Sequence, residues 1–314
     1  MITVVKCTTL VTLQDNGRFG YRHLGVSQAG ALDALSLSLA NALVGNRSDE
    51  AALEIFLGGV TLSFEQDTSI ALTGSECFAS LSSPSQTKAT QSLFIGKAYS
   101  VKKGDTLTIN RNRSGLCIYL AVAGGMDVPI VMGSKSSDVQ SRLGAAALRS
   151  QDQIRLSEHS EVQKQSDHPA IKLPHFNNEI SMMVGPEFER LNLSSQTRFF
   201  NDEFTISAKS NRMGFRLEGA SLSKSEAVEL LSHAVFPGMI QLPNDGQPII
   251  LGPECQTTGG YPRIGAVIEA DLWKLGHLRP GAKVRFKRVT LAQAKKEQQQ
   301  NTLYLDRVQE VLQA

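Results

Sequence analysis

Residues 18–22 read RFGYR, and residues 212–216 read RMGFR. A second pair of blocks recurs in the same order, with GSEC at 74–77 and GPEC at 252–255. In the third pair, Gly104 precedes TLTI at 106–109 and Gly281 precedes KVRF at 283–286. Internal similarity at a long spacing indicates a duplicated structural unit. We therefore predict two copies of one β-rich unit in tandem; the alternative is that a β-rich chain reuses glycine-containing turns.

The rest of the chain agrees with a mainly β fold, because short apolar or alternating runs are separated by Gly, Pro, Asn and Asp. A closed barrel is expected for each copy, since closure removes exposed strand edges. Few helices are predicted: one at 31–43, short turns at 186–192 and 270–275, and an amphipathic C-terminal helix at 291–312. The expected strands are 1–6, 60–64, 69–72, 106–109, 116–122, 153–156, 248–251 and 283–286.

The predicted division of the chain follows the repeat and one polar segment. The polar segment holds His159, His168 and His175. A solvated linker is a better interpretation of this segment than a metal site, because its histidines do not have the spacing of a known set of metal ligands. The predicted parts are a first β unit with the inserted helix (1–157), the linker (158–178), a second β unit (179–289) and a helical tail (290–314).

Composition excludes several classes of protein. The 314 residues contain 32 Lys and Arg against 30 Asp and Glu, a net charge of +2, which argues against a nucleic-acid binder. No apolar run is long enough to cross a membrane, and the first residues lack the features of a signal peptide. The four cysteines are far apart, so reduced thiols in the cytoplasm are expected.

Common catalytic motifs are missing from the sequence. It contains no P-loop, no G-x-G-x-x-G after a strand, no G-x-S-x-G and no H-E-x-x-H, and the Met-Lys-Met signature of an attached biotin is also missing. We therefore expect no metal site and no biotin on this chain. If ATP or biotin is used, an uncommon site or a partner supplies the binding groups.

Residues 14–33 are rich in glycine and polar side chains and form the first candidate site, in which we predict that Asp33 binds substrate. Arg18 could hold a carboxylate or phosphate through two parallel hydrogen bonds. The alternative is that Arg18 pairs with Asp15 across a tight turn. His23 is a candidate acid–base group, although a lone histidine is more often structural.

The second candidate site follows from the repeat. Asn211 and Arg212 stand where the first copy has Gly17 and Arg18. Asn211 is predicted to bind substrate, and Arg212 is, like Arg18 and His23, a candidate catalytic residue. Two related arginines could face a shared cleft or form two equivalent structural corners, and the sequence leaves both open.

A third candidate site combines two hydroxyls, an amide, a phenol and two glycines in six residues. Such a set suits an oxyanion or a substrate carbonyl group. We predict substrate binding by Gln256, Thr257, Thr258, Gly259, Gly260 and Tyr261.

Long segments of the chain resemble the allophanate hydrolase subunit 2 family, also called biotin-dependent carboxyltransferase-like proteins. The resemblance runs from about Val11 to Phe286. Two departures are the partial fit of Ser75-Glu76 and the lack of an arginine in residues 251–255. The matching runs are TLQDNGRFGYRHLGVSQAGALDALSLSLANALVGN (12–46), YLAVAGGMDVPIVMGSKS (119–136), SNRMGFRLEG (210–219), PGMIQLPNDGQPIIL (237–251) and QTTGGYPRIG (256–265).

The resemblance implies two cyclophilin-like β-barrel units and an activity that this chain shares with other subunits. With a smaller B subunit it would use ATP, with or without Mg²⁺, to phosphorylate the lactam carbonyl of 5-oxoproline. A third component, the A subunit, would complete the ring opening to L-glutamate. Fused relatives transfer a carboxyl group from carboxybiotin to urea, which is the alternative activity. An alternative from a different class of function is that the chain is a non-catalytic regulatory partner of a kinase inhibitor.

Overall fold

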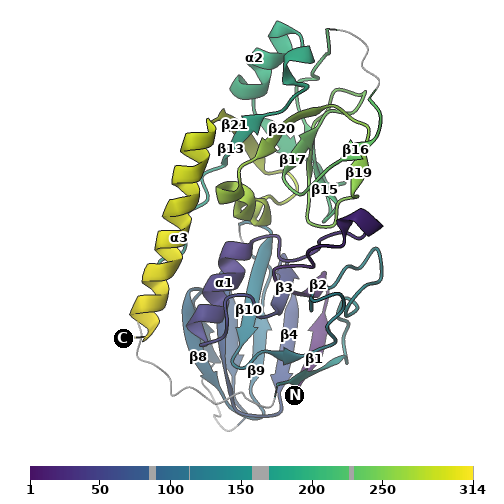
Figure 1. Cartoon of the computed structure of the whole chain (residues 1–314). Helices are drawn as coiled ribbons and strands as arrows, with labels where there is room; N and C mark the ends of the chain where they lie inside the picture. Colours follow the sequence, from purple (N-terminus) through teal and green to yellow (C-terminus); the bar gives the residue numbers. More distant parts are fainter. Residues whose placement is uncertain (85–89, 113, 158–169, 226–229, 314) are drawn as a thin grey trace. The chain divides into compact units, whose positions relative to one another are not determined.

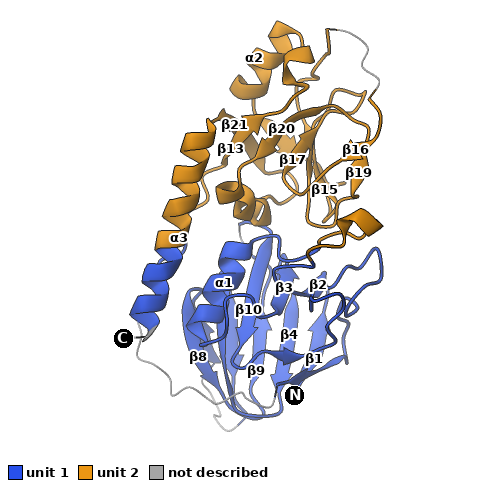
Figure 2. Cartoon of the chain, in the orientation of Figure 1, with its two compact units in different colours: residues 1–18, 29–174, 304–314 blue, residues 19–28, 175–303 orange. Residues whose placement is uncertain are grey.

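The computed structural model describes the chain in two compact units (Figure 2), which are treated separately below. His159 and His168 of the expected linker lie outside the described residues, whereas His175 belongs to the second unit. The boundaries expected at 157, 178 and 289 stay predictions. The described residues are 1–84, 90–112, 114–157, 170–225 and 230–313. The first unit comprises residues 1–18, 29–174 and 304–314, and the second comprises 19–28 and 175–303.

Two hydrogen-bonded sheets form the first unit (Figure 1). The larger sheet has the order β11(Met126–Asp127), β12(Gln153–Leu156), β1(Ile2–Cys7), β4(Val60–Phe64), β9(Thr106–Ile109), β6(Ala79–Ser82) and β7(Thr90–Leu93). The smaller sheet has the order β2(Val11–Gln14), β3(Ala52–Phe56), β10(Cys117–Val122), β5(Thr68–Gly74) and β8(Lys97–Val101).

One hydrophobic core joins these two sheets, with Val4 and Leu62 from the larger sheet and Leu72 and Leu120 from the smaller. The helix α1(Ala34–Leu43) contacts β5, β10 and β3 of the smaller sheet. Both β5 and β10 are buried along their whole length, as expected for strands covered on two faces. The first unit thus buries its near-continuous apolar runs between a helix and a second sheet.

The second unit is a closed barrel of seven strands. Its strands β13 and β21 pair in parallel, and the remaining neighbours are antiparallel. A separate two-stranded ribbon pairs β16(His233–Ala234) with β19(Thr258–Gly259). The barrel order is β13(Glu179–Val184), β20(Arg263–Val267), β17(Met239–Gln241), β18(Ile249–Leu251), β15(Gly214–Glu218), β14(Phe204–Ile206) and β21(Lys283–Arg288).

The mainly β fold class is confirmed, with a closed barrel in the second unit, whereas the first unit consists of two sheets in place of the closed barrel expected for each copy. The helices differ from expectation in detail. Helix α1 begins at Ala34 instead of 31, because the Asp33 side chain caps it by accepting from Ser36 N at 2.8 Å. Helix α2(Leu193–Asn201), which the sequence analysis did not predict, is capped by Asn192. The other helices are η1(Arg22–Leu24), η2(Phe188–Arg190), η3(Glu269–His277) and α3(Leu291–Gln313). None of the helices in the described ranges is long and apolar enough to cross a bilayer.

The three repeated pairs differ in how far their local structures agree. In the third pair, Gly104 and Gly281 both lie shortly before a strand, β9 and β21. Gly74 ends β5 and Gly252 directly follows β18, so the second pair occupies similar strand ends. The RMGFR block runs into β15, whereas the RFGYR block lies in a loop that leads into η1. The similarity of the first pair therefore does not extend to its local structure.

Candidate functional site

The loop after β2 is organised by the carboxylate of Asp15. Its Oδ1 accepts hydrogen bonds from Gly17 N and Ser134 Oγ, both at 2.7 Å, and from the hydroxyl of Ser136. Its Oδ2 accepts from Lys135 N at 2.6 Å. Four donors from the chain therefore surround this carboxylate.

Arg18 follows in the same loop and is only 1% exposed. Its Nη2 donates to the backbone carbonyl of Ser136, while Nε and Nη1 have no hydrogen-bond partner in the part of the chain that the structure describes. Gly144 allows the neighbouring loop to approach, because a Cβ there would meet the Ser136 carbonyl and lie 3.5 Å from Arg18 Nη2. The alternative of a direct Asp15–Arg18 pair is wrong, since the partner of Arg18 is a carbonyl group.

Asp33, a predicted binding residue, belongs to a buried polar network of the first unit. The Tyr119 hydroxyl accepts from Asp33 N at 2.8 Å and donates to Glu54 Oε2, which also accepts from Leu32 N. Burial, and then the negative charge of Glu54, raises the pKa of Tyr119 well above its usual value. These contacts attach the start of α1 to β3 and β10, which gives Asp33 a structural function.

The counterpart arginine of the second unit is paired. Arg212 is 4% exposed, and its Nε donates to Glu254 Oε1 in a salt bridge. The neighbouring Asn211 is exposed and closes a local turn by accepting from Met213 N at 2.8 Å. The two matched arginines thus have different electrostatic environments.

The predicted loop 256–261 lies in the second unit and includes β19. Its residues Gln256, Thr258 and Tyr261 are exposed, as a binding surface requires. The ribbon partner β16 contributes His233, whose Nε2 is buried with no hydrogen-bond partner from the described residues. The structure therefore brings His233 next to the predicted loop, in register with Gly259.

Arg22 fixes this loop from another segment of the same unit. Its Nη2 donates to the carbonyl groups of Val235 and Gln256, the latter at 3.1 Å, and lies 3.9 Å from Cys255 Sγ. Burial raises the pKa of the Cys255 thiol, and the nearby Arg22 charge opposes that shift. Sequence analysis did not single out Arg22, although it is the second arginine of RFGYR.

A bidentate ion pair lies directly after the loop. Arg263 donates from Nε and Nη2 to Glu187 at 2.9 and 2.6 Å, and its backbone N–H donates to the same carboxylate at 2.8 Å. The hydrogen bonds from Arg263 lower the pKa of Glu187 below its usual value, against the opposing effect of burial. Gln241 Nε2 reaches Tyr261 O at 3.5 Å. An ion pair and a hydrogen bond therefore hold the C-terminal end of the loop.

Two further predictions concern His23 as an acid–base group and metal binding. His23 is exposed on η1, and the structure gives it no partner among the described residues. Within the described ranges, no group of three or more His, Cys, Asp and Glu side chains is arranged to hold a metal ion.

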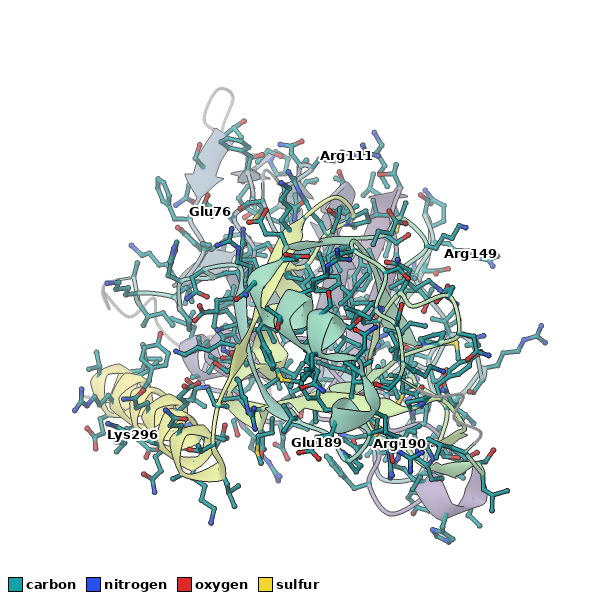
Figure 3. The ribbon with its side chains drawn as sticks, turned by 90° about the horizontal axis from the view of Figure 1, so that it is seen from above. Glu76, Arg111, Arg149, Glu189, Arg190 and Lys296 are labelled. Carbon is teal, nitrogen blue, oxygen red and sulfur yellow. The ribbon has the colours of Figure 1, made fainter. Side chains whose placement is uncertain are left out.

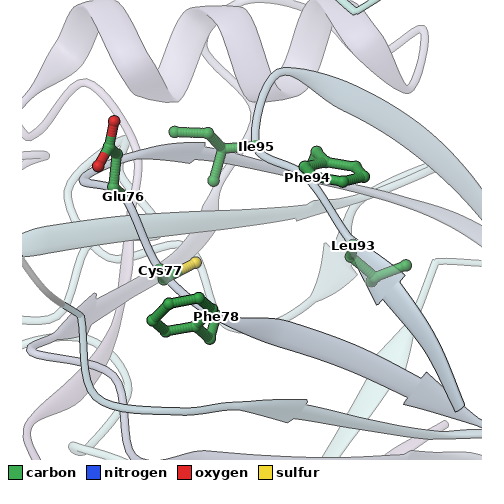
Figure 4. Close-up of a pocket in the computed structure, with 6 residues that line it drawn as sticks. All are labelled: Glu76, Cys77, Phe78, Leu93, Phe94 and Ile95. Carbon is green, nitrogen blue, oxygen red and sulfur yellow. The ribbon is translucent and has the colours of Figure 1, made fainter.

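A cavity of about 320 Å³ lies in the first unit beside β6 and β7 (Figure 4). Phe78 and Phe94 are exposed at this cavity, and burial raises the pKa of Cys77 to about 12. Glu76 also lines the cavity and is exposed at the molecular surface (Figure 3). The remaining lining residues of the cavity are apolar: Leu93 and Ile95.

The hydroxyls of Ser134 and Ser136 were missed as parts of a site. A signal existed, because three serines within residues 134–137 directly follow Gly133. Their partner Asp15 lies 119 and 121 residues away in sequence, so only the fold brings them together.

Comparison with known proteins identifies a family whose model matches most of the chain. The carboxyltransferase domain, subdomain A and B, matches residues 24–288. The chain is 39% identical to the C subunit of 5-oxoprolinase from Escherichia coli strain K12 over 309 residues, which cover 98% of this chain and 97% of that protein. It is 34% identical to the corresponding C subunit from Haemophilus influenzae over 315 residues, 99% of each chain.

A solved structure shares the whole fold. The crystal structure of the K. lactis urea amidolyase superposes with a TM-score of 0.88 at 27% sequence identity. The match covers 98% of this chain and 20% of that much longer chain. The fold of this chain therefore also occurs as one part of a larger protein.

Proposed function

The chain belongs to the carboxyltransferase domain family with subdomains A and B, and from this premise we propose that it is one component of an ATP-dependent 5-oxoprolinase. The observation that carries the proposal is the 39% identity to the C subunit of a 5-oxoprolinase along almost the full length of both chains. Its partners are then a smaller B subunit and a third component, the A subunit. The four free cysteines suit a reducing compartment, and we expect the complex to act in the cytoplasm.

The proposed reaction begins with a poor electrophile, because the carbonyl group of a five-membered lactam is stabilised by its nitrogen. Transfer of the γ-phosphoryl group of ATP to the carbonyl oxygen releases ADP and activates the carbon. One water then adds, and the ring C–N bond breaks to give an acyl phosphate. A second water releases phosphate and leaves L-glutamate.

This chain offers two groups of residues for such a reaction. The exposed loop 256–261 presents hydroxyl, amide and backbone N–H groups, which suit the oxygen on which negative charge develops. The ion pair of Glu187 and Arg263 holds the end of that loop, so the donors are fixed before substrate binds. We propose that the loop belongs to the substrate-binding surface of the second unit.

ATP is a second substrate in this proposal. The described residues include no cluster of carboxylates that would hold a metal, so Mg²⁺ would arrive with the phosphate groups of ATP. We propose that ATP binds with the help of the B subunit.

The test is reconstitution. The chain is mixed with the B and A subunits, 5-oxoproline and Mg-ATP, and glutamate and ADP are both measured. We expect glutamate only when all three proteins and ATP are present. No glutamate from the complete mixture would overturn the proposal.

A carboxyltransferase acting on urea or a similar amide is the second candidate, favoured by the match of 98% of this chain to a part, 20%, of the K. lactis urea amidolyase. This activity needs a biotinylated carrier from another chain. A mixture with carboxylated carrier protein and urea distinguishes the two: transfer of labelled carboxyl to urea, without glutamate formation, supports this second candidate.

A further inference from the structure

The buried guanidinium of Arg18 is not explained by the contacts of the first unit. The side chain is 1% exposed, and Nε and Nη1 have neither solvent nor a partner among the described residues. A buried charge without a counter-charge is unfavourable, because it loses its hydration without compensation. An arginine held in this state is typical of a place where a ligand supplies the missing charge.

The chain's own carboxylate nearby does not supply it. Asp15 already accepts four hydrogen bonds, from Gly17 N, Ser134 Oγ, Lys135 N and Ser136 Oγ. The Ser136 carbonyl takes one N–H of Arg18 and is a neutral acceptor. The positive charge therefore has no paired anion in its hydrogen-bonding shell.

The geometry of the guanidinium group defines what can bind. Arginine has five N–H donors in a planar fork, and Nη2 carries two of them. One Nη2 hydrogen points toward the Ser136 carbonyl, so the other still forms a parallel pair with Nε–H or with Nη1–H. Either pair matches the two oxygens of a carboxylate.

We propose that Arg18 is the binding residue for the carboxylate of a small monocarboxylic acid. This inference rests on the proposed function, in which the substrate 5-oxoproline carries one carboxylate beside its lactam ring. A monoanion neutralises the single charge of Arg18. A phosphate dianion would leave an excess negative charge close to Asp15, which is why a carboxylate is favoured over ATP phosphate.

The test measures ligand binding to the full chain, alone and in the complex with the B and A subunits, through the midpoint of thermal unfolding. Because Arg18 has almost no exposed surface, entry requires local opening, and samples are incubated to equilibrium. The probes are 5-oxoproline, 2-pyrrolidone, which has the lactam without the carboxylate, and inorganic phosphate.

We expect 5-oxoproline to raise the midpoint by a few degrees at saturation, with a much smaller effect of 2-pyrrolidone and of phosphate. The rise should disappear in Arg18→Gln and shrink strongly in Arg18→Lys, which keeps the charge without the planar fork. Arg149→Gln is the matched control, since Arg149 is an exposed arginine of the same unit (Figure 3), and should keep the full rise.

Three outcomes would overturn the inference. The first is that 5-oxoproline does not raise the unfolding midpoint of the wild-type chain, either alone or in the complex. The others are an unchanged rise of the midpoint in Arg18→Gln, or a larger rise with phosphate than with 5-oxoproline. Failure of the proposed function gives a different result. A complete mixture that makes no glutamate, together with an Arg18-dependent rise, contradicts the 5-oxoprolinase proposal and leaves the carboxylate site standing.

Discussion

Arg18 in the first unit and Arg212 in the second begin matching blocks of sequence, and both are almost fully buried. Arg212 forms a salt bridge with Glu254, whereas Arg18 donates only to a backbone carbonyl. The repeat also pairs Glu76 with Glu254, but Glu76 is exposed beside a cavity. Glu254 thus neutralises the arginine of the second unit, whereas its counterpart Glu76 lines a cavity in the first unit.

The difference shows that an arginine in similar sequence blocks can be paired with a carboxylate in one unit and lack such a partner in the other. A buried arginine with its own carboxylate is complete and supports the barrel. A buried arginine without a carboxylate partner destabilises its unit, and this free-energy cost is explained if the arginine binds a ligand, as proposed above. Measurements of stability can separate these two conditions.

The largest effect is expected for Arg212→Met. Removal of the cation breaks the buried salt bridge with Glu254, which should lower the free energy of unfolding by about 3–5 kcal/mol. Denaturant unfolding measures this, and Arg216→Met in the same block, at an exposed position, is the control. A loss below about 1 kcal/mol would remove the contrast between the units.

A smaller loss is expected for Glu187→Gln, which weakens the bidentate pair with Arg263 by about 1–3 kcal/mol. The pKa of Glu187 is lowered in the folded chain, so its stabilisation is complete above the unfolded value near 4.5 and is lost as the pH falls through the folded value. Unfolding at a series of pH values from 7 downward should therefore show a steeper decline in the wild type than in the variant. Parallel curves would contradict this assignment.

Arg18→Met should change the free energy of unfolding of the ligand-free chain by less than about 1 kcal/mol, or increase it, because the apolar side chain avoids the desolvation of an unpaired charge. Chemical denaturation is measured next to Arg212→Met under the same conditions. A loss as large as that of Arg212→Met would show that Arg18 is structural and that the two arginines are equivalent after all.

The smallest effect is expected for Glu76→Gln, within about 0.5 kcal/mol of wild type, because the carboxylate is exposed. Glu254→Gln is its matched counterpart and should cost clearly more, since it disrupts a buried salt bridge. Equal losses for the two variants would mean that the repeated acids have the same function.

Several elements could be predicted from sequence because local pattern decides them. The strands at 60–64, 106–109 and 153–156 have the predicted bounds, since alternating or apolar runs there end at turn residues. Helix α2 was missed because its sequence LSSQTRFFN is mostly polar and buries only Ser195 and Phe199. Its start was nevertheless encoded by Asn192, whose side chain accepts from Ser195 N.

The candidate site could be predicted only in part, because pairing depends on distant residues. Arg18 and Ser136 are 118 positions apart, and Arg212 and Glu254 are 42 apart. No local pattern distinguishes an arginine that will meet a carboxylate from one that will meet a carbonyl group. The loop 256–261 was recognisable because its polar groups and glycines are contiguous.

The interleaving of the two units has a consequence for dissecting the protein. Residues 19–28 belong to the unit otherwise formed by 175–303, and residues 304–314 belong to the unit otherwise formed by the first part of the chain. A gene split at the polar segment would therefore yield two fragments, each lacking a piece of its own unit and carrying a piece of the other. Either half would need its missing segment added, for example by fusion through a linker, before its behaviour could be compared with that of the intact chain.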